Sequence, residues 1–130
     1  MTPGEHKGFI DLNPKSALGA EKVQLHLNPP SALIYMALGF DEGARKYGAF
    51  NWRHGKVSAS TYISALERHL LAWIDGEDID PNSGKPHLAH MLASIAILVD
   101  AIEMKNLIDD RPPPGNAGEV LERWKCMVGL

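Results

Sequence analysis

Chemistry-bearing side chains gather in one short window of the sequence, residues 68–90. The window holds three histidines, several carboxylates and two cations, within a chain of 130 residues that is 45% hydrophobic. Burying such groups without partners destabilises a domain by an amount comparable to its spare stability. We therefore interpret this window as a candidate site rather than as part of the core.

The spacing of the histidines predicts that they converge. His87 and His90 are three residues apart, so they share one face of a helix. His69 lies near the end of the preceding predicted helix, and a short loop makes the two helices antiparallel neighbours. That loop carries Glu77 and Asp80. Imidazole and carboxylate groups around one point suit a divalent metal, so these five residues form the predicted metal site.

Cations and aromatic residues around the window support a second interpretation, in which the polar site holds nucleotide phosphates without a metal. Arginine binds phosphate through paired hydrogen bonds and lysine as a point charge, whereas a tryptophan ring stacks on a base. The candidate nucleotide-binding residues are Lys46, Asn51, Trp52, Arg53, Arg68, Trp73 and Lys85. The spacing of Trp73 also fits the core. Glu42 and Lys46, four residues apart, also fit an exposed helical ion pair.

Helices must position these residues, because apolar side chains recur at helical spacing and no segment alternates with period two. The first helix opens at 29–31 and closes at Gly48. Ser58 or Ser60 caps the second, which ends at Gly76. The third runs from about residue 87 to 107 and is apolar almost all round, as expected at the centre of a bundle or at a subunit interface.

These elements predict an all-α fold, a small bundle of three main helices with a short C-terminal helix. Residues 1–28 form an irregular N-terminal arm, and residues 29–110 form the helical domain that carries the site. Residues 111–130 form a proline-rich linker and the last helix, which Asn116 and Glu119 begin with a capping-box pattern. The apolar faces of the third and last helices predict a homo-oligomer, a dimer or larger.

Composition excludes several classes of protein. The 13 basic and 16 acidic residues leave a slight negative charge, which argues against binding nucleic acid through its phosphates. The single cysteine, Cys126, excludes intrachain disulfides and cysteine-based zinc sites. The N-terminus lacks the apolar segment of a signal peptide, and the longest apolar run, 91–99, is too short to span a bilayer. We expect a cytoplasmic protein with no membrane partner.

Seven short motifs, spread over about residues 20–107, resemble a small domain of phage and prophage proteins that is labelled dATP/dGTP diphosphohydrolase, N-terminal. They are Asn28-Pro29-Pro30-Ser31-Ala32-Leu33, Gly43-Ala44-Arg45-Lys46-Tyr47-Gly48, Asn51-Trp52-Arg53, Arg68-His69-Leu70-Leu71-Ala72-Trp73, Gly76-Glu77-Asp78-Ile79-Asp80, Ser83-Gly84 and His87-Leu88-Ala89-His90. The resemblance implies a purine deoxynucleotide as ligand and, for a phage protein, the host cytoplasm as its compartment.

The helix pair is also distantly similar to the MazG-like all-α nucleoside triphosphate pyrophosphohydrolases. Those enzymes hold Mg²⁺ with Glu-x-x-Glu on one helix and Glu-x-x-Asp on the next. In this chain His87-x-x-His90 stands where Glu-x-x-Asp is expected, and no second glutamate accompanies Glu67. The resemblance implies Mg²⁺ or Mn²⁺, whereas two imidazoles favour Mn²⁺, Zn²⁺ or another transition metal.

The leading hypothesis is a metal-dependent phosphohydrolase that releases diphosphate from a purine deoxynucleoside triphosphate, with Glu77, Asp80, Arg68 and Lys46 as catalytic residues. The alternative is a catalytically silent module that binds or sequesters a nucleotide, for phage counter-defence or beside a partner enzyme. An HD-type phosphohydrolase is disfavoured because the chain has no His-Asp dipeptide. A purely structural helical protein is the remaining interpretation.

Overall fold

A computed structural model of the chain describes residues 10 and 12–128 and has a mostly helical fold, as predicted. Its helices are α1 (Pro14–Gly19), α2 (Pro30–Tyr47), α3 (Ala59–Ile74), α4 (His87–Glu103) and α5 (Ala117–Val128). Single 3-10 turns occupy η1 (Leu25–Leu27) and η2 (Asn51–Arg53). Two very short strands, β1 (Val57–Ser58) and β2 (Leu107–Ile108), pair in parallel. Cys126 belongs to α5, but its side chain lies outside the described part of the chain.

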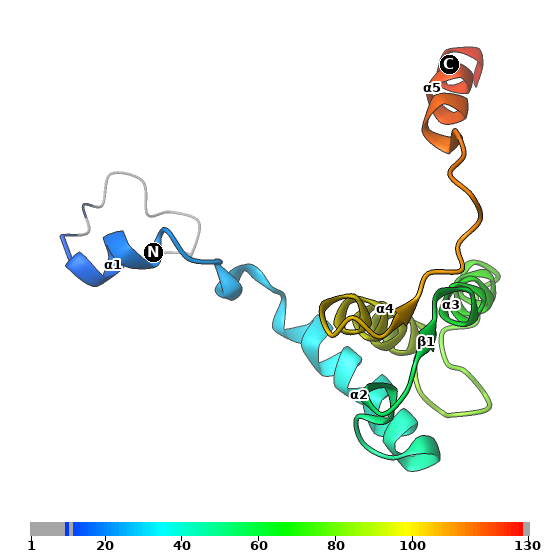
Figure 1. Cartoon of the computed structure of the whole chain (residues 1–130), viewed down its shortest axis with the longest axis horizontal. Helices are drawn as coiled ribbons and strands as arrows, with labels where there is room; N and C mark the ends of the chain where they lie inside the picture. Colours follow the sequence, from blue (N-terminus) through cyan, green and yellow to red (C-terminus); the bar gives the residue numbers. More distant parts are fainter. Residues whose placement is uncertain (1–9, 11, 129–130) are drawn as a thin grey trace.

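Helix α4 is the centre of the molecule, because it packs against both α2 and α3 (Figure 1). Its buried residues on these contacts are small, Ala89, Ala93 and Ala101, which lets the helices approach closely. Gly39 marks the tightest approach: a Cβ there would lie 2.5 Å from the Ala89 carbonyl oxygen and 2.8 Å from the Ala93 Cβ. This crossing fixes α2 against the first turns of α4, where the predicted site residues begin.

Glycine ends α2, the first of the three predicted main helices, as expected. Gly48 adopts φ 90° and its N–H donates to the Ala44 carbonyl. Helix α3, the second predicted main helix, begins where the serines predicted it. The side chain that caps it comes from Asp110, far along the chain. The Ser58 side chain makes no capping bond, whereas the Ser60 N–H donates to Asp110 Oδ1 at 2.8 Å and its hydroxyl contacts the other carboxylate oxygen.

Helix α4 is shorter than predicted, since it ends at Glu103 rather than near residue 107. Lys105 takes the left-handed conformation at φ 58°, and the chain turns into β2. Asn106 then donates from Nδ2 to the carbonyls of Trp52 and Gly55, both at 2.8 Å. These bonds and the β1–β2 pairing replace the helical hydrogen bonds that the apolar pattern of Leu107 and its neighbours predicted.

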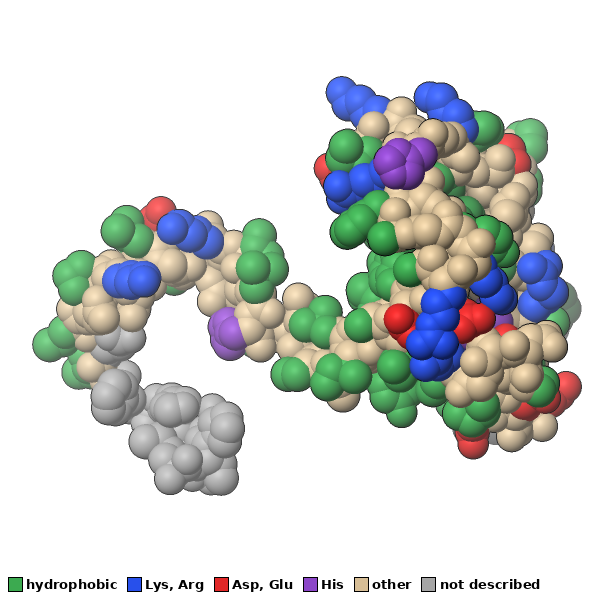
Figure 2. Space-filling model, turned by 90° about the horizontal axis from the view of Figure 1, so that it is seen from below, with side chains coloured by type: hydrophobic (Ala, Val, Ile, Leu, Met, Phe, Trp, Pro, Cys, Tyr) green, Lys and Arg blue, Asp and Glu red, His purple; other side chains and the backbone are tan. Residues whose placement is uncertain are grey.

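Two segments extend away from the α2–α4 core (Figure 1). The N-terminal arm is less irregular than predicted, because Asn13 Oδ1 accepts the Lys15 N–H at 2.9 Å and begins α1. Helix α5 begins directly after Asn116, as predicted. Figure 2 shows solvent-exposed hydrophobic side chains along the arm and the start of α2. No helix in the described part of the chain is long and apolar enough to cross a membrane.

Candidate functional site

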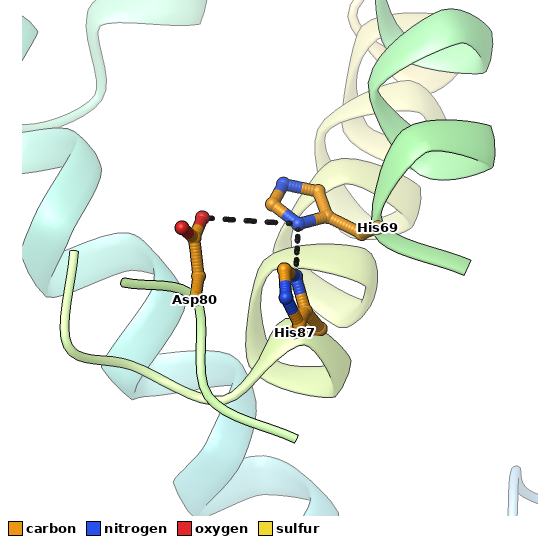
Figure 3. A group of neighbouring side chains, drawn as sticks. All are labelled: His69, Asp80 and His87. Carbon is orange, nitrogen blue, oxygen red and sulfur yellow. Dashed lines mark hydrogen bonds and ion pairs between the residues drawn. The ribbon is translucent and has the colours of Figure 1, made fainter. Parts of the chain in front are cut away.

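Three side chains from different elements meet at one point (Figure 3). His69 comes from α3, His87 is the first residue of α4, and Asp80 comes from the loop between them. One donor atom from each lies within 4.8 Å of the others. The two Nδ1 atoms are 2.8 Å apart, and Asp80 Oδ2 lies 4.0 Å from His69 Nδ1. The predicted convergence of these residues is therefore present in the structure.

The loop that carries Asp80 is held by its own backbone. The Asp80 N–H donates to the Lys85 carbonyl, and the His87 N–H donates to the Asp78 carbonyl, both at 2.9 Å. Gly84 makes the return possible because it takes φ 72°, which most side chains disfavour. The Asp80 carboxylate also accepts the Asn82 N–H. The sequence between the two helices thus fixes Asp80 locally, against the first turn of α4.

Glu77 lies behind the cluster rather than between its donor atoms. Its Oε1 is 2.7 Å from His87 Nε2, on the edge of the ring opposite Nδ1. Because a carboxylate only accepts, this bond assigns the proton of a neutral His87 to Nε2 and leaves the Nδ1 lone pair facing His69 and Asp80. A carboxylate that orients a histidine in this way is the usual outer partner of a metal-binding imidazole.

His90 completes the wall of the cluster. Its ring stacks on His69 with centroids 4.8 Å apart and an angle of 13°. Its Nε2 lies 2.6 Å from Ser83 Oγ and 3.9 Å from Asp80 Oδ2. The helical spacing of His87 and His90 therefore places both imidazoles beside the same aspartate.

The environment lowers the pKa of two of the imidazoles and so favours their neutral form. Burial lowers the pKa of His69, and the neighbouring His90 and His87 lower it further. Burial also lowers the pKa of His90, although the carboxylates of Asp80 and Glu42 act in the opposite direction. Since only a neutral imidazole has a lone pair to share, these shifts favour metal binding.

A pocket of about 670 Å³ opens next to the cluster. It lies between α2, the segment 48–52 and α4, with Tyr62 contributed by α3. Its wall is largely apolar and aromatic, and includes Met36, Phe40, Phe50, Trp52, Tyr62 and Ile97. Phe40 and Trp52 contact with ring centroids 4.9 Å apart. A pocket of this size and lining suits a flat ring such as a nucleobase.

Helix α2 supplies the polar rim of this pocket. Lys46 Nζ lies 3.6 Å from Glu42 Oε1, so the predicted i,i+4 pair forms. The pair is not simply exposed, because only 14% of the Glu42 side chain is accessible, whereas half of Lys46 is. Both residues line the pocket and influence the pKa of His90. Asn51 lines the same pocket.

The other predicted nucleotide-binding residues lie elsewhere. Arg53 makes two hydrogen bonds to the Asp100 carboxylate, each 2.9 Å long, and Trp52 Nε1 donates to the same group at 2.8 Å. These bonds raise the pKa of Arg53 and lower that of Asp100. They tie η2 to α4. Arg68, Trp73 and Lys85 are outside the pocket lining, although the charge of Arg68 lowers the pKa of His69.

Sequence reasoning left several contributors out of the site. Ser83 bonds to His90, Tyr62 lines the pocket, and Asp100 holds the loop that carries Trp52. Asp100 had a detectable signal, because it is the acid that ends the apolar run 91–99. Tyr62 had none, since a tyrosine at helical spacing resembles any core residue.

The fold and site define a helical domain with a histidine–aspartate cluster at the edge of an aromatic pocket. Residues 12–111 match the family described as dATP/dGTP diphosphohydrolase, N-terminal, so the chain belongs to this family, as its motifs predicted. The match concerns only an N-terminal domain. No curated protein and no solved structure matches the chain significantly.

Proposed function

We propose that this domain binds a purine deoxynucleoside triphosphate beside a divalent metal and hydrolyses it to the monophosphate and diphosphate. The observation that carries the proposal is the position of His90, which stacks on His69 in the cluster and also lines the aromatic pocket. A base in the pocket would place its phosphates next to the cluster. The description of the family supports a purine deoxynucleotide as the ligand.

The residues present fit a metal ion. His69, Asp80 and His87 offer two imidazole nitrogens and one carboxylate oxygen, and each comes from a different element that is fixed without the ion. Bound there, a divalent metal would polarise a phosphoryl oxygen and offset the charge of the triphosphate. With two nitrogen donors out of three, Mn²⁺ or Zn²⁺ suits the set better than Mg²⁺.

The chain's own residues have separate tasks in this proposal. The aromatic wall with Trp52 holds the base, and Asn51 is placed to hydrogen-bond its edge. Lys46 lies at the rim with half of its side chain accessible, where its ammonium offsets phosphate charge. Glu77 holds the His87 ring rather than the ligand. Arg53 acts through Asp100, by fixing the loop that carries Trp52.

A catalytically silent nucleotide-binding module is the second candidate. Its support is the donor set itself, because a single carboxylate stands among the three clustered donors of the described chain. The pyrophosphohydrolases that the helix pair resembles use paired carboxylates for their metal. Under this proposal the pocket and Lys46 bind the nucleotide, and the nucleotide is released unchanged.

One experiment separates the two candidates. The full chain is incubated with each deoxynucleoside triphosphate and Mg²⁺, Mn²⁺ or Zn²⁺, and monophosphate and diphosphate are quantified while calorimetry measures binding. Diphosphate release that is abolished by Asp80→Asn and kept in His54→Ala, a histidine outside the cluster, supports hydrolysis. Binding with the ligand recovered intact supports the silent module. No binding of any nucleotide contradicts both.

A further inference from the structure

Helix α5 is an amphipathic helix without a packing surface. Within the described chain it has no substantial contact with any other helix or strand. Val120, Leu121 and Trp124 follow helical spacing on one side of it, and Leu121 is 74% accessible. A helix of 12 residues with such a stripe gains most of its stability from packing and is marginal alone.

A matching surface lies on the core. The outward side of α4 carries Leu88, Ile95, Val99 and Ile102 at helical spacing, all substantially exposed, and Ile102 is 57% accessible. Beside it, α3, α4 and the segment 105–111 line a groove of about 630 Å³, with Ile63, Leu98 and Ile102 among its apolar residues and Lys105, Asp109 and Arg111 as its charged ones. We call this surface the α3–α4 groove. By helical rise, the α4 stripe is about 21 Å long and α5 is about 18 Å long.

The linker directs α5 away from the groove of its own chain, although Arg111 at the start of the linker belongs to the groove lining. Asp110 is anchored to the start of α3 through Ser60, and Arg111 pairs with Asp109 through two bonds of 2.7 Å. Pro112, Pro113 and Pro114 follow, and consecutive prolines favour a stiff, extended backbone. The root of α5 is therefore fixed, and the helix projects away from the core (Figure 1).

The exposed area agrees with a missing partner. The chain exposes 10469 Å². A compact monomer of this mass exposes about 6,800 Å², and each partner in a standard interface buries about 800 Å². The difference exceeds the area that each partner buries in a standard interface, so the extended chain leaves enough accessible surface for a stable dimer.

We infer that α5 docks into the α3–α4 groove of a second copy of this chain, and that the two copies exchange their C-terminal helices. In this arrangement Leu121 and Trp124 cover Ile102 and Val99 of the partner. When two copies exchange the same element, the two contacts are identical and a two-fold axis relates the copies. The dimer is then closed, with no unused docking surface left for a third copy. The inference does not depend on the metal or on nucleotide hydrolysis.

Sedimentation velocity of the full chain at micromolar concentrations tests the inference. The expected species has twice the monomer mass, and the paired substitution Leu121→Asp with Trp124→Asp is expected to yield a monomer. Since α5 does not pack on its own core, circular dichroism should show that α2–α4 remain folded. The control is Glu122→Gln, on the opposite side of α5, which should stay dimeric. A monomeric parent chain, or a dimer that survives the paired substitution, overturns the inference.

Mixing two variants distinguishes the exchange of α5 between two copies from docking of α5 within one chain. Ile102→Asp alters an exposed position, so the core should fold while its groove loses α5. The Ile102→Asp chain keeps an intact α5, and the Leu121→Asp, Trp124→Asp chain keeps an intact groove. Each should be monomeric alone, and their mixture should form a heterodimer. If the mixture stays monomeric, α5 does not dock in the groove of a second copy.

Discussion

At the scale of single residues, the cluster depends on which edge of each imidazole is available. His87 has one ring nitrogen bound to Glu77 and the other turned to His69 and Asp80. A carboxylate bound to one ring nitrogen leaves the other nitrogen free for a metal. It also determines in which direction the lone pair of that nitrogen points. Glu77 was predicted as a metal ligand, and its position instead supports a role as a positioning residue for His87.

The substitution Glu77→Gln tests this role. We expect metal affinity to fall by about 10–100-fold, as is typical when the outer partner of a metal-bound histidine is changed. Titration calorimetry with Mn²⁺ or Zn²⁺ measures the affinity, and ¹⁵N spectroscopy of the metal-free chain should show a change in the His87 tautomer.

Asp78→Asn is the matched control, because this acid belongs to the same loop and its side chain is exposed. Its metal affinity should equal that of the parent chain. Unchanged affinity and tautomer in Glu77→Gln would contradict the positioning role.

At the scale of elements, the position of α2 is decided by one glycine. Gly39 allows the helix to approach Ala89 and Ala93 of α4, and this approach brings Glu42 and Lys46 to the pocket rim. The site therefore depends on a close helix contact in the wall of its pocket, which Gly39 and Ala93 both line.

We predict that Gly39→Ala destabilises the fold by about 1–3 kcal/mol, since the added Cβ must displace backbone rather than a flexible side chain. Gly43→Ala in the same helix is the control. A Cβ at residue 43 meets nothing within 4 Å. It should leave stability unchanged or raise it by about 0.5–1 kcal/mol, because alanine favours the helix. Urea unfolding followed by circular dichroism measures both, and equal effects would contradict the close contact.

The link between Asp110 and Ser60 predicts a pH dependence. Hydrogen bonds from the Ser60 side chain and backbone lower the pKa of Asp110 below its ordinary value of 3.8. The folded chain therefore binds this proton less readily than the unfolded chain. The stabilisation is complete above the ordinary pKa and is lost as the pH falls through the lowered value.

Asp110→Asn should accordingly be less stable than the parent chain near neutral pH, with the difference narrowing in acid. Unfolding in urea across this pH range gives the difference directly. Asp75→Asn, at an exposed acid after α3, is the control and should follow the parent chain. A difference that stays constant with pH would show that the carboxylate charge does not stabilise α3.

At the scale of the whole molecule, the proposed exchange of α5 would couple stability to protein concentration. If two copies exchange α5, unfolding also separates them, so mass action favours the folded dimer at high concentration. The core then gains stability from a helix that it does not contact within its own chain.

We therefore expect the melting temperature to rise with protein concentration over about a hundredfold range, and to become independent of concentration in Trp124→Asp. Differential scanning calorimetry measures it. A melting temperature that does not change with concentration in the parent chain would contradict the exchange.

The sequence by itself determined the helices and the core of the site. Gly48 and Pro30 set the bounds of α2 by their backbone preferences, and the spacing of His87 and His90 places both on one helical face. The Asp80 loop closes through bonds between near neighbours in the chain. All these features depend on local geometry, which the order of residues specifies.

Only the tertiary structure decided the rest. Trp52 with Asp100 and Ser60 with Asp110 are joined across about 50 positions, and the pocket forms where α2, η2 and α4 cross. Such contacts depend on the angle and register between helices. Apolar periodicity leaves these undetermined, because any helix that buries its stripe satisfies the pattern. For the same reason the sequence predicted that α4 and α5 have apolar faces, whereas the structure revealed that α5 and the outward side of α4 have no substantial packing partner in the described part of the chain.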